Sequence, residues 1–293
     1  MQSRSFGSTG LVVSVLGFGA GHIGGGEMSE DHAGTLINRA VDRGVNLIDT
    51  ARGYGLSEER VGRHLSWRRH EIVLSTKGGY GVPGCADWTG ECITRGVEDA
   101  LGRMRTDWID IFHLHSCPIH VLQREDLLRA LEDAVRAGKV RVAAYSGDEA
   151  PLGWAIASGR FRSVETSVNL CDQRVIAEHL PAAGVRGLGV IAKRPLANAP
   201  WRFGERPVGH YAEVYWERWR AMGIDPGELS WDELALRFAA YCPGVSSAIV
   251  GTASVENLER DVALVERGPL PDEVVRAIRE AFQRKDQGWV GQI

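Results

Sequence analysis

Eight apolar, β-like segments recur along this chain, and each is followed by a helical pattern of apolar residues or by an insertion. The predicted strands cover residues 14–18, 45–48, 72–76, 108–112, 140–144, 163–167, 187–191 and 247–250. Strands that alternate with helices in this way are parallel and are joined by right-handed crossovers. Eight such units in 293 residues predict an α/β protein with a closed (β/α)8 TIM barrel, and a doubly wound open sheet is the rival fold.

Two segments depart from the repeat. Residues 3–6 and 11–13 flank a Gly-rich turn and predict an N-terminal β-hairpin. Residues 197–226 are rich in Trp, Arg, Gly and Pro and are too long for an ordinary loop, so we expect an extended, partly helical insertion over the active-site face. The sequence contains no repeat or linker that marks a domain boundary, and we therefore expect residues 1–293 to form a single barrel domain.

Composition excludes several classes of function. The formal net charge is −4 and neither end carries a basic block, so we expect neither a nucleic-acid nor a membrane partner. No apolar run approaches the ~18 residues that span a bilayer. The five cysteines form no CxxC pair, so we expect no metal site and a reducing compartment. The N-terminus lacks the apolar run of a secretion signal, and we therefore expect a cytoplasmic protein that is a monomer or a small homo-oligomer.

Four polar residues follow three of the predicted strands. Asp49 and Tyr54 follow the second strand, Lys77 follows the third and His115 follows the fourth. If these strands are neighbours in a parallel barrel, all four side chains emerge at the carboxyl end, where barrel enzymes hold their active sites. His113 lies two residues before His115 and faces the same side of an extended strand, so alternation leaves both histidines open.

These residue types suit the reduction of a small-molecule carbonyl substrate, an aldehyde or a ketone. The reaction needs a hydride on carbon and a proton on oxygen. Tyrosine, with a reference pKa near 10, is protonated at neutral pH and can donate that proton. We expect the Lys77 ammonium to lower the pKa of Tyr54, and Asp49 to supply the counter-charge that a buried lysine needs. A histidine near the carbonyl oxygen orients the substrate.

Four segments resemble the aldo-keto reductase family: Asp49 to Gly55 with the following Ser57-Glu58, Ser75-Thr76-Lys77, Asp110 to His115, and Gly138 to Arg141. The resemblance implies a TIM barrel in which Tyr54 is the general acid and Lys77 and Asp49 tune it. It also selects His115 over His113 as the residue that orients the carbonyl. Tyr54, His115 and Trp88 are the implied substrate contacts.

The resemblance also implies a nicotinamide dinucleotide across the barrel mouth. Gly17 to Gly21 lacks the third glycine of a GxGxxG motif, so a Rossmann site is not expected. The implied cofactor contacts are Gly19, Ala20, Asp49, Ser146, Gly147, Glu165, Lys193, Arg194, Leu196, Gly251, Thr252, Ser254, Asn257 and Asp261.

Several of these positions depart from the family pattern. Gly147 stands where the family has Asn, and Lys193 stands where many members have an aromatic that stacks on nicotinamide. Glu165 replaces a Gln and can accept a hydrogen bond from the carboxamide, but it cannot donate one when ionised. Ala253 and Asn257 replace basic residues that hold the 2′-phosphate. We therefore expect NADP(H) as the cofactor with NAD(H) as the alternative, and a cofactor-binding regulatory subunit with little turnover as the alternative function.

Overall fold

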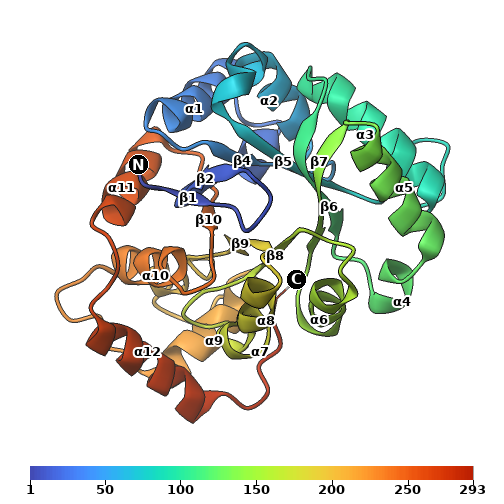
Figure 1. Cartoon of the computed structure of the whole chain (residues 1–293). Helices are drawn as coiled ribbons and strands as arrows, with labels where there is room; N and C mark the ends of the chain where they lie inside the picture. Colours follow the sequence, from blue (N-terminus) through green and yellow to red (C-terminus); the bar gives the residue numbers. More distant parts are fainter. Residues whose placement is uncertain (293) are drawn as a thin grey trace.

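The computed structural model describes residues 1–292, in which eight parallel strands close into a barrel in the order β10-β3-β4-β5-β6-β7-β8-β9 (Figure 1). The barrel strands are β3 (Leu16–Gly19), β4 (Leu47–Asp49), β5 (Val73–Gly78), β6 (Ile109–His115), β7 (Val140–Ser146), β8 (Ser163–Ser167), β9 (Gly189–Lys193) and β10 (Ser247–Val250). This topology confirms the predicted TIM barrel and excludes the open sheet.

Helices surround the barrel, as Figure 1 shows. The α-helices are α1 (Glu30–Asp42), α2 (Ser57–Leu65), α3 (Gly90–Met104), α4 (Ile119–Leu122), α5 (Glu125–Arg136), α6 (Glu149–Ser158), α7 (Arg174–Glu178), α8 (Leu180–Val185), α9 (Glu213–Met222), α10 (Trp231–Ala240), α11 (Val255–Glu266) and α12 (Asp272–Lys285). Short 3-10 turns are η1 (Ala20–Gly24), η2 (Ser66–Glu71) and η3 (Pro200–Arg202). Among residues 1–292, no helix is both long enough and apolar enough to cross a membrane.

The predicted hairpin closes the amino end of the barrel. Strands β1 (Ser3–Ser5) and β2 (Val12–Ser14) pair antiparallel, and Phe6, which follows β1, is fully buried. Phe6 packs in one apolar cluster with Leu47 and Val73, the first residues of β4 and β5. The amino end is therefore filled with apolar side chains, and polar chemistry is left to the carboxyl end.

Local pairing explains two shifts from the sequence prediction. Ser14 belongs to the hairpin, because it pairs with Ser3, and the first barrel strand therefore begins at Leu16 rather than at residue 14. The helix expected near residues 174–180 ends at Glu178, and a second one begins at Leu180 with a proline in its first turn. Proline has no N–H to continue a helix but fits the first turn of a new one.

The insertion at residues 197–226 is partly helical, because it contains η3 and α9. Its Trp201 ring stacks on Trp231 of α10 with centroids 5.8 Å apart, and the Trp201 indole N–H donates to Asp232 at 2.9 Å. Apolar packing against α10 thus anchors one side of the insertion to the barrel wall.

Candidate active site

The barrel brings the four predicted residues to its carboxyl end. Asp49 is the last residue of β4 and His115 the last residue of β6, while Lys77 lies near the end of β5. Strand β5 lies between β4 and β6, with Ser75 opposite Asp49 and Lys77 opposite His113, so all three residues lie within two positions of one another at the same end of adjacent strands. Tyr54 comes from the loop between β4 and α2, and the centroid of its ring lies 6.1 Å from that of the His115 ring.

Close backbone packing fixes the Tyr54 loop. A Cβ on Gly24 would lie 1.7 Å from the Tyr54 carbonyl oxygen, so only glycine fits in η1 at this point. The Leu56 N–H donates to the Gly24 carbonyl at 3.0 Å, and Gly55 has a φ of +56°, a left-handed conformation that favours glycine. Two glycines far apart in the sequence therefore hold the tyrosine against the barrel mouth.

Lys77 is the centre of a buried charge cluster. Its ammonium donates to the Asp49 carboxylate and to the Thr50 carbonyl at 3.1 Å, and it lies 3.4 Å from Glu165 Oε2 on β8. It also lies 5.4 Å from the centroid of the Tyr54 ring. Burial alone would lower the pKa of Lys77, but attraction to the two carboxylates outweighs burial and raises it, so the lysine stays charged.

The two carboxylates repel each other. Burial and the charge of Glu165 raise the pKa of Asp49 to about 6, in spite of the opposing attraction of Lys77. The Ser75 hydroxyl donates to Asp49 Oδ1 at 2.7 Å and supports the ionised form. Asp49 is therefore mostly ionised at pH 7, and one ammonium faces two carboxylates.

The expectation that Lys77 brings the pKa of Tyr54 down toward neutrality is wrong. Lys77 does lower that pKa, but burial of the ring and the charges of Asp49 and Glu165 outweigh it, and the pKa of Tyr54 is raised above its usual value near 10. The phenol is therefore protonated throughout the physiological range, as a proton donor must be.

The two histidines differ in depth. His113 is fully buried and its Nε2 lies 3.1 Å from the Ser75 hydroxyl, so it belongs to the floor of the cluster. His115 is partly exposed at the mouth. Burial, followed by repulsion from Lys77, lowers the pKa of His115 to about 3, so its imidazole is neutral. His113 and His115, which strand alternation could not distinguish, therefore differ in how deeply they lie in the barrel.

Tyr80 is a site residue that the sequence reasoning missed. Its hydroxyl lies 2.8 Å from His115 Nδ1, and its ring lies 5.7 Å from the ring of Trp88, the predicted substrate contact. A hydrogen bond from Tyr80 to Nδ1 places the remaining imidazole proton on Nε2. The one sequence signal was the pair Gly78-Gly79, which brings Tyr80 back over the strand end.

On the β7 and β9 side, the predicted cofactor residues are held by their neighbours. A Cβ on Gly147 would lie 2.3 Å from the Tyr145 hydroxyl, which explains why no Asn stands here. Lys193 forms an ion pair with Asp148 at 2.9 Å, so its charge is compensated. Ser146, beside this pair at the end of β7, is buried.

On the β3 and β10 side, two chain segments approach closely. A Cβ on Gly19 would lie 3.4 Å from the Gly251 backbone nitrogen, so the backbones of these two predicted cofactor residues lie close together. The buried Ala20 follows Gly19 directly. The Ser254 hydroxyl caps α11 by accepting from the Asn257 N–H at 3.1 Å. Thr252, just before this cap, is also largely buried.

Two further predicted cofactor residues, Asp261 and Leu196, are at least partly buried. Asp261 is buried on α11, and burial raises the pKa of its carboxyl to about 7. Within residues 1–292, its Oδ1 receives no hydrogen bond. Leu196 is partly buried and packs against the core beyond β9.

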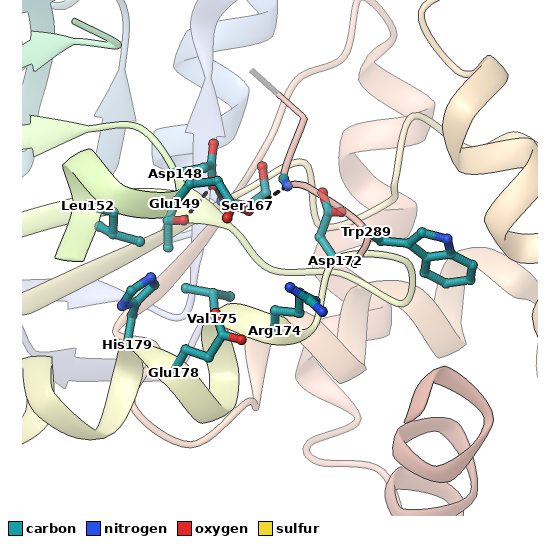
Figure 2. A pocket seen from close by; sticks show the side chains of 12 residues that line it. Asp148, Glu149, Leu152, Ser167, Asp172, Arg174, Val175, Glu178, His179 and Trp289 are labelled. Carbon is teal, nitrogen blue, oxygen red and sulfur yellow. Dashed lines mark hydrogen bonds between the residues drawn. The ribbon is translucent and has the colours of Figure 1, made fainter. Parts of the chain in front are cut away.

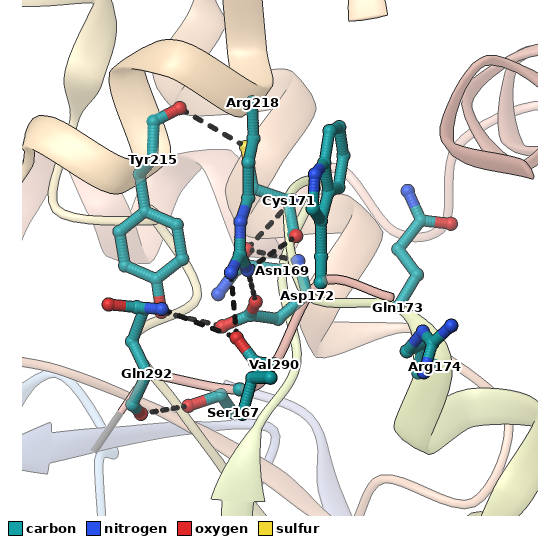
Figure 3. Close-up of polar contacts among 12 residues, drawn as sticks. Ser167, Asn169, Cys171, Asp172, Gln173, Arg174, Tyr215, Arg218, Val290 and Gln292 are labelled. Atoms are coloured by element: carbon teal, nitrogen blue, oxygen red, sulfur yellow. Dashed lines mark hydrogen bonds and ion pairs between the residues drawn. The ribbon is translucent and has the colours of Figure 1, made fainter. Parts of the chain in front are cut away.

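A polar network, shown in Figure 3, holds the C-terminal tail against the carboxyl end of the barrel. Arg218 of α9 pairs with Asp172 and donates to the Val290 carbonyl at 2.7 Å, while Tyr215 donates to Asp172 at 2.6 Å. Arg194 donates to the Gln292 carbonyl and to Tyr211. The arrangement thus engages Arg194 with the tail rather than leaving it free at the mouth.

Figure 2 shows a cavity beside this tail, lined by Asp148, Glu149 and Trp289 among others. Its volume is about 20 Å³, room for one water molecule, so it cannot take an organic substrate.

Backbone strain gathers at the same end of the barrel. Within residues 1–292, every non-glycine residue with positive φ except Arg105 lies between the end of a barrel strand and the first turn of the helix that follows it: Trp88, Ser116, Glu149, Arg194 and residues 197–199. Such conformations cost on the order of 1–3 kcal/mol each and tend to occur at functional sites.

One group of potential metal ligands lies in this cluster. Side-chain atoms of Asp49, His113 and Glu165 lie within 4.8 Å of one another. The Lys77 ammonium already contacts both carboxylates, so a cation of the protein's own occupies the position that a metal ion would need.

Comparison with known proteins agrees with this geometry. The family model of the Aldo/keto reductase family matches residues 15–283. The chain belongs to the aldo-keto reductase family. L-galactose dehydrogenase from Arabidopsis thaliana is 28% identical over 291 residues, covering 90% of this chain and 88% of that protein. A probable voltage-gated potassium channel subunit beta from the same plant is 27% identical over 326 residues, covering 97% of this chain and 98% of that one.

Among solved structures, the holo form of an aldo-keto reductase from Bacillus halodurans matches with a TM-score of 0.83 and 27% identity, covering 96% of each chain. Membership of this family makes the protein an oxidoreductase. The Tyr54–Lys77 cluster lies where a TIM barrel holds its active site.

Proposed function

We propose that this aldo-keto reductase transfers a hydride from NAD(P)H to an aldehyde or ketone, with Tyr54 as the proton donor. The observation that carries the proposal is the contact of the buried Lys77 with Asp49, together with its place over the Tyr54 ring. A fully buried lysine needs a paired charge, which Asp49 supplies, and an ammonium held in a cleft beside a tyrosine ring is suited to stabilise the phenolate of Tyr54.

The roles of the side chains follow from their positions. Tyr54 passes its proton to the carbonyl oxygen as negative charge develops there. Lys77 stabilises the resulting phenolate, and Asp49 keeps the lysine in place. His115 is neutral and hydrogen-bonded to Tyr80, so its Nε2–H can donate to the same oxygen and orient it. Trp88 and Tyr80 form an aromatic wall beside the substrate.

The residues at the mouth fit a nicotinamide dinucleotide, which supplies the hydride when bound. Glu165 Oε2 is buried and receives no hydrogen bond within residues 1–292, so it can accept from a carboxamide NH2. The closely approaching backbones of Gly19 and Gly251, together with the backbone N–H groups at the start of α11, suit the adenosine phosphates. Asp261 Oδ1, also without a partner in the described chain, can accept from the adenine amino group. We propose NADP(H) as the cofactor, with NAD(H) as the alternative because Ala253 and Asn257 supply no cation.

The experiment is the loss of NAD(P)H absorbance with a panel of aldehydes, ketones and aldoses, for the wild type and for Tyr54→Phe. Aldoses belong in the panel because one relative is named for L-galactose. We expect turnover by the wild type and a loss of at least 100-fold in Tyr54→Phe, the usual contribution of a general acid. Undiminished turnover in Tyr54→Phe would refute the proton-donor role.

The second candidate function is a cofactor-binding regulatory subunit, which the channel-subunit relatives favour. It predicts cofactor binding without turnover of any carbonyl in the panel. The intact group of Asp49, Tyr54, Lys77 and His115 favours the enzyme, because cofactor binding alone does not need a proton donor.

A further inference from the structure

Arg194 is a cation at the barrel mouth whose hydrogen-bond partners are all neutral. Within residues 1–292, its Nη1 donates to the Ser167 hydroxyl at 3.3 Å and to the Gln292 carbonyl, and its Nη2 donates to the Tyr211 hydroxyl. A guanidinium has five N–H groups, so these contacts leave the Nε–H and one Nη2–H without an acceptor in the described chain. Nε and Nη2 form one edge of the guanidinium, and such an edge binds two oxygens of a phosphate.

The charge of Arg194 has no carboxylate of its own. Asp148 attracts it through space, but the Asp148 carboxylate already forms an ion pair with Lys193 at 2.9 Å. In the part of the chain that the structure describes, no carboxylate forms an ion pair with Arg194 itself. A half-buried cation that only neutral groups hold favours an anionic ligand.

The C-terminal tail that contacts Arg194 is held at neighbouring residues as well, as Figure 3 shows for the Val290 carbonyl. This carbonyl accepts from Arg218 of α9 at 2.7 Å, and the Gly291 N–H donates to Glu149 Oε1 at 2.8 Å. Glu149 and Arg194, which bind successive tail residues, both have a positive φ, 56° and 53°. Strained backbone of this kind persists where its surroundings impose it, and it clusters at ligand-binding sites. The strain thus coincides with two of the residues that fix the tail.

The tail lies beside the predicted cofactor residues. Each of three residues that it contacts comes one to three positions after a predicted cofactor contact at the end of a barrel strand. The pairs are Ser146 and Glu149 on the β7 side, Glu165 and Ser167 on β8, and Lys193 and Arg194 on the β9 side. A nicotinamide that contacts these strand ends therefore lies next to the tail, with the diphosphate of the dinucleotide one ribose away.

We propose that the C-terminal tail, residues 288–292, positions the Arg194 guanidinium to bind the diphosphate of the nicotinamide dinucleotide. This inference rests on the proposed function. Arg194 is the group that contacts the cofactor, and the tail acts only through it. The tail holds Nη1, which turns the opposite edge of the guanidinium, with its Nε–H, toward the anion. Displacement of the tail therefore weakens the grip on the cofactor while the Tyr54 chemistry is left in place.

Gly291→Val displaces the tail without a change to Arg194. A Cβ at Gly291 would lie 3.0 Å from the Asp148 Cβ. The Asp148 side chain cannot move aside, because its Oδ1 accepts from the Thr166 hydroxyl at 2.6 Å and from the Ser167 N–H at 2.9 Å. The larger valine side chain must therefore push the tail away from the strand ends.

Gly204→Val is the matched control. Gly204 is exposed in the insertion, and no atom of residues 1–292 lies within 4 Å of a Cβ at that position. The other variants are Arg194→Met, which removes the guanidinium, and the double variant Arg194→Met with Gly291→Val. Urea denaturation checks that each variant is folded, and Gly291→Ala, which adds the Cβ alone, takes the place of Gly291→Val if the valine unfolds the protein.

The test measures the release of the cofactor apart from turnover. The full chain is loaded with NADPH, and in parallel with NADH, and is mixed in a stopped-flow instrument with an excess of the oxidised form. The decay of the dihydronicotinamide fluorescence gives the rate at which the reduced cofactor leaves. Both cofactors carry the diphosphate, so each variant should change the two release rates by the same factor.

We expect release to accelerate about tenfold in Arg194→Met, which loses charged hydrogen bonds, and about fivefold in Gly291→Val. Gly204→Val should stay within about twofold of the wild type, and the double variant within about twofold of Arg194→Met, because the tail acts through that residue. Unchanged release in Arg194→Met or Gly291→Val, or effects that multiply in the double variant, overturn the inference and leave the proposed function standing. Binding of neither cofactor by the wild type overturns both.

Discussion

Replacement of Lys77 by Met tests the charge balance of the active site through stability rather than through activity. Met has nearly the length of the lysine stem, so packing is largely kept while the ammonium is lost. Asp49 and Glu165 then face each other in a buried site without a cation. Removal of one partner of a buried ion pair typically costs about 3–5 kcal/mol. We therefore expect Lys77→Met to lose about 4 kcal/mol of unfolding free energy at pH 8.

The sign of the pH dependence follows from Asp49. Its pKa in the folded protein is already raised to about 6, above the unfolded value near 4, so the folded state holds the proton more tightly than the unfolded state does. Ionisation of Asp49 therefore costs stability as the pH rises through this range. Without Lys77 the pKa of Asp49 rises further, so the pH range over which ionisation of Asp49 lowers stability extends above pH 6. At pH 5 a proton relieves the repulsion, and we expect the loss in Lys77→Met to shrink to about 2 kcal/mol.

The assay is urea denaturation at pH 5 and pH 8, followed by tryptophan fluorescence. Lys139→Met is the matched control, because Lys139 pairs with Glu98 with 42% of its side chain exposed, and such pairs contribute at most about 1 kcal/mol. A loss in Lys77→Met that is equal at both pH values, or no larger than in the control, would refute the reasoning that Lys77 balances buried carboxylates.

Three further predictions address single positions. Tyr80→Phe removes the hydrogen bond to His115 Nδ1, and we expect kcat/KM for the best carbonyl substrate to fall about fivefold to tenfold with the fold intact; unchanged kinetics would show that Tyr80 does not orient the imidazole. Gly147→Asn restores the family residue but places a Cβ against the Tyr145 hydroxyl, so urea denaturation should reveal a loss of about 1–3 kcal/mol; a neutral result would contradict the close contact. Ala253→Arg adds a guanidinium beside the start of α11, and titration should show tighter binding of NADPH relative to NADH by about tenfold; equal gains for both would place the 2′-phosphate elsewhere.

The barrel could be predicted because its signal is local and repeated. Each strand and helix is marked by the spacing of apolar residues over a few positions, and parallel alternation leaves few ways to connect eight units. The errors occur where tertiary pairing overrides this signal, as at Ser14, which the hairpin takes from the first barrel strand. The grouping of Asp49, Lys77 and His115 was also predictable, because the ends of parallel strands meet at one face.

The behaviour of those groups was decided by the tertiary structure. The sequence predicted that Lys77 lowers the pKa of Tyr54, but it could not show that Glu165, far along the chain, adds a second carboxylate to the same cluster. Nor could it show that Tyr80 turns back to hold His115, or that Lys193 is paired with Asp148.

The sequence by itself thus determined the barrel, the end of the barrel at which the polar residues gather, and the identity of those residues. The fold decided how deeply each of them is buried and which charged groups lie close together. The physical reason is that secondary structure depends on neighbours along the chain, whereas the energy of a charge depends on burial and on through-space distances to residues from other strands.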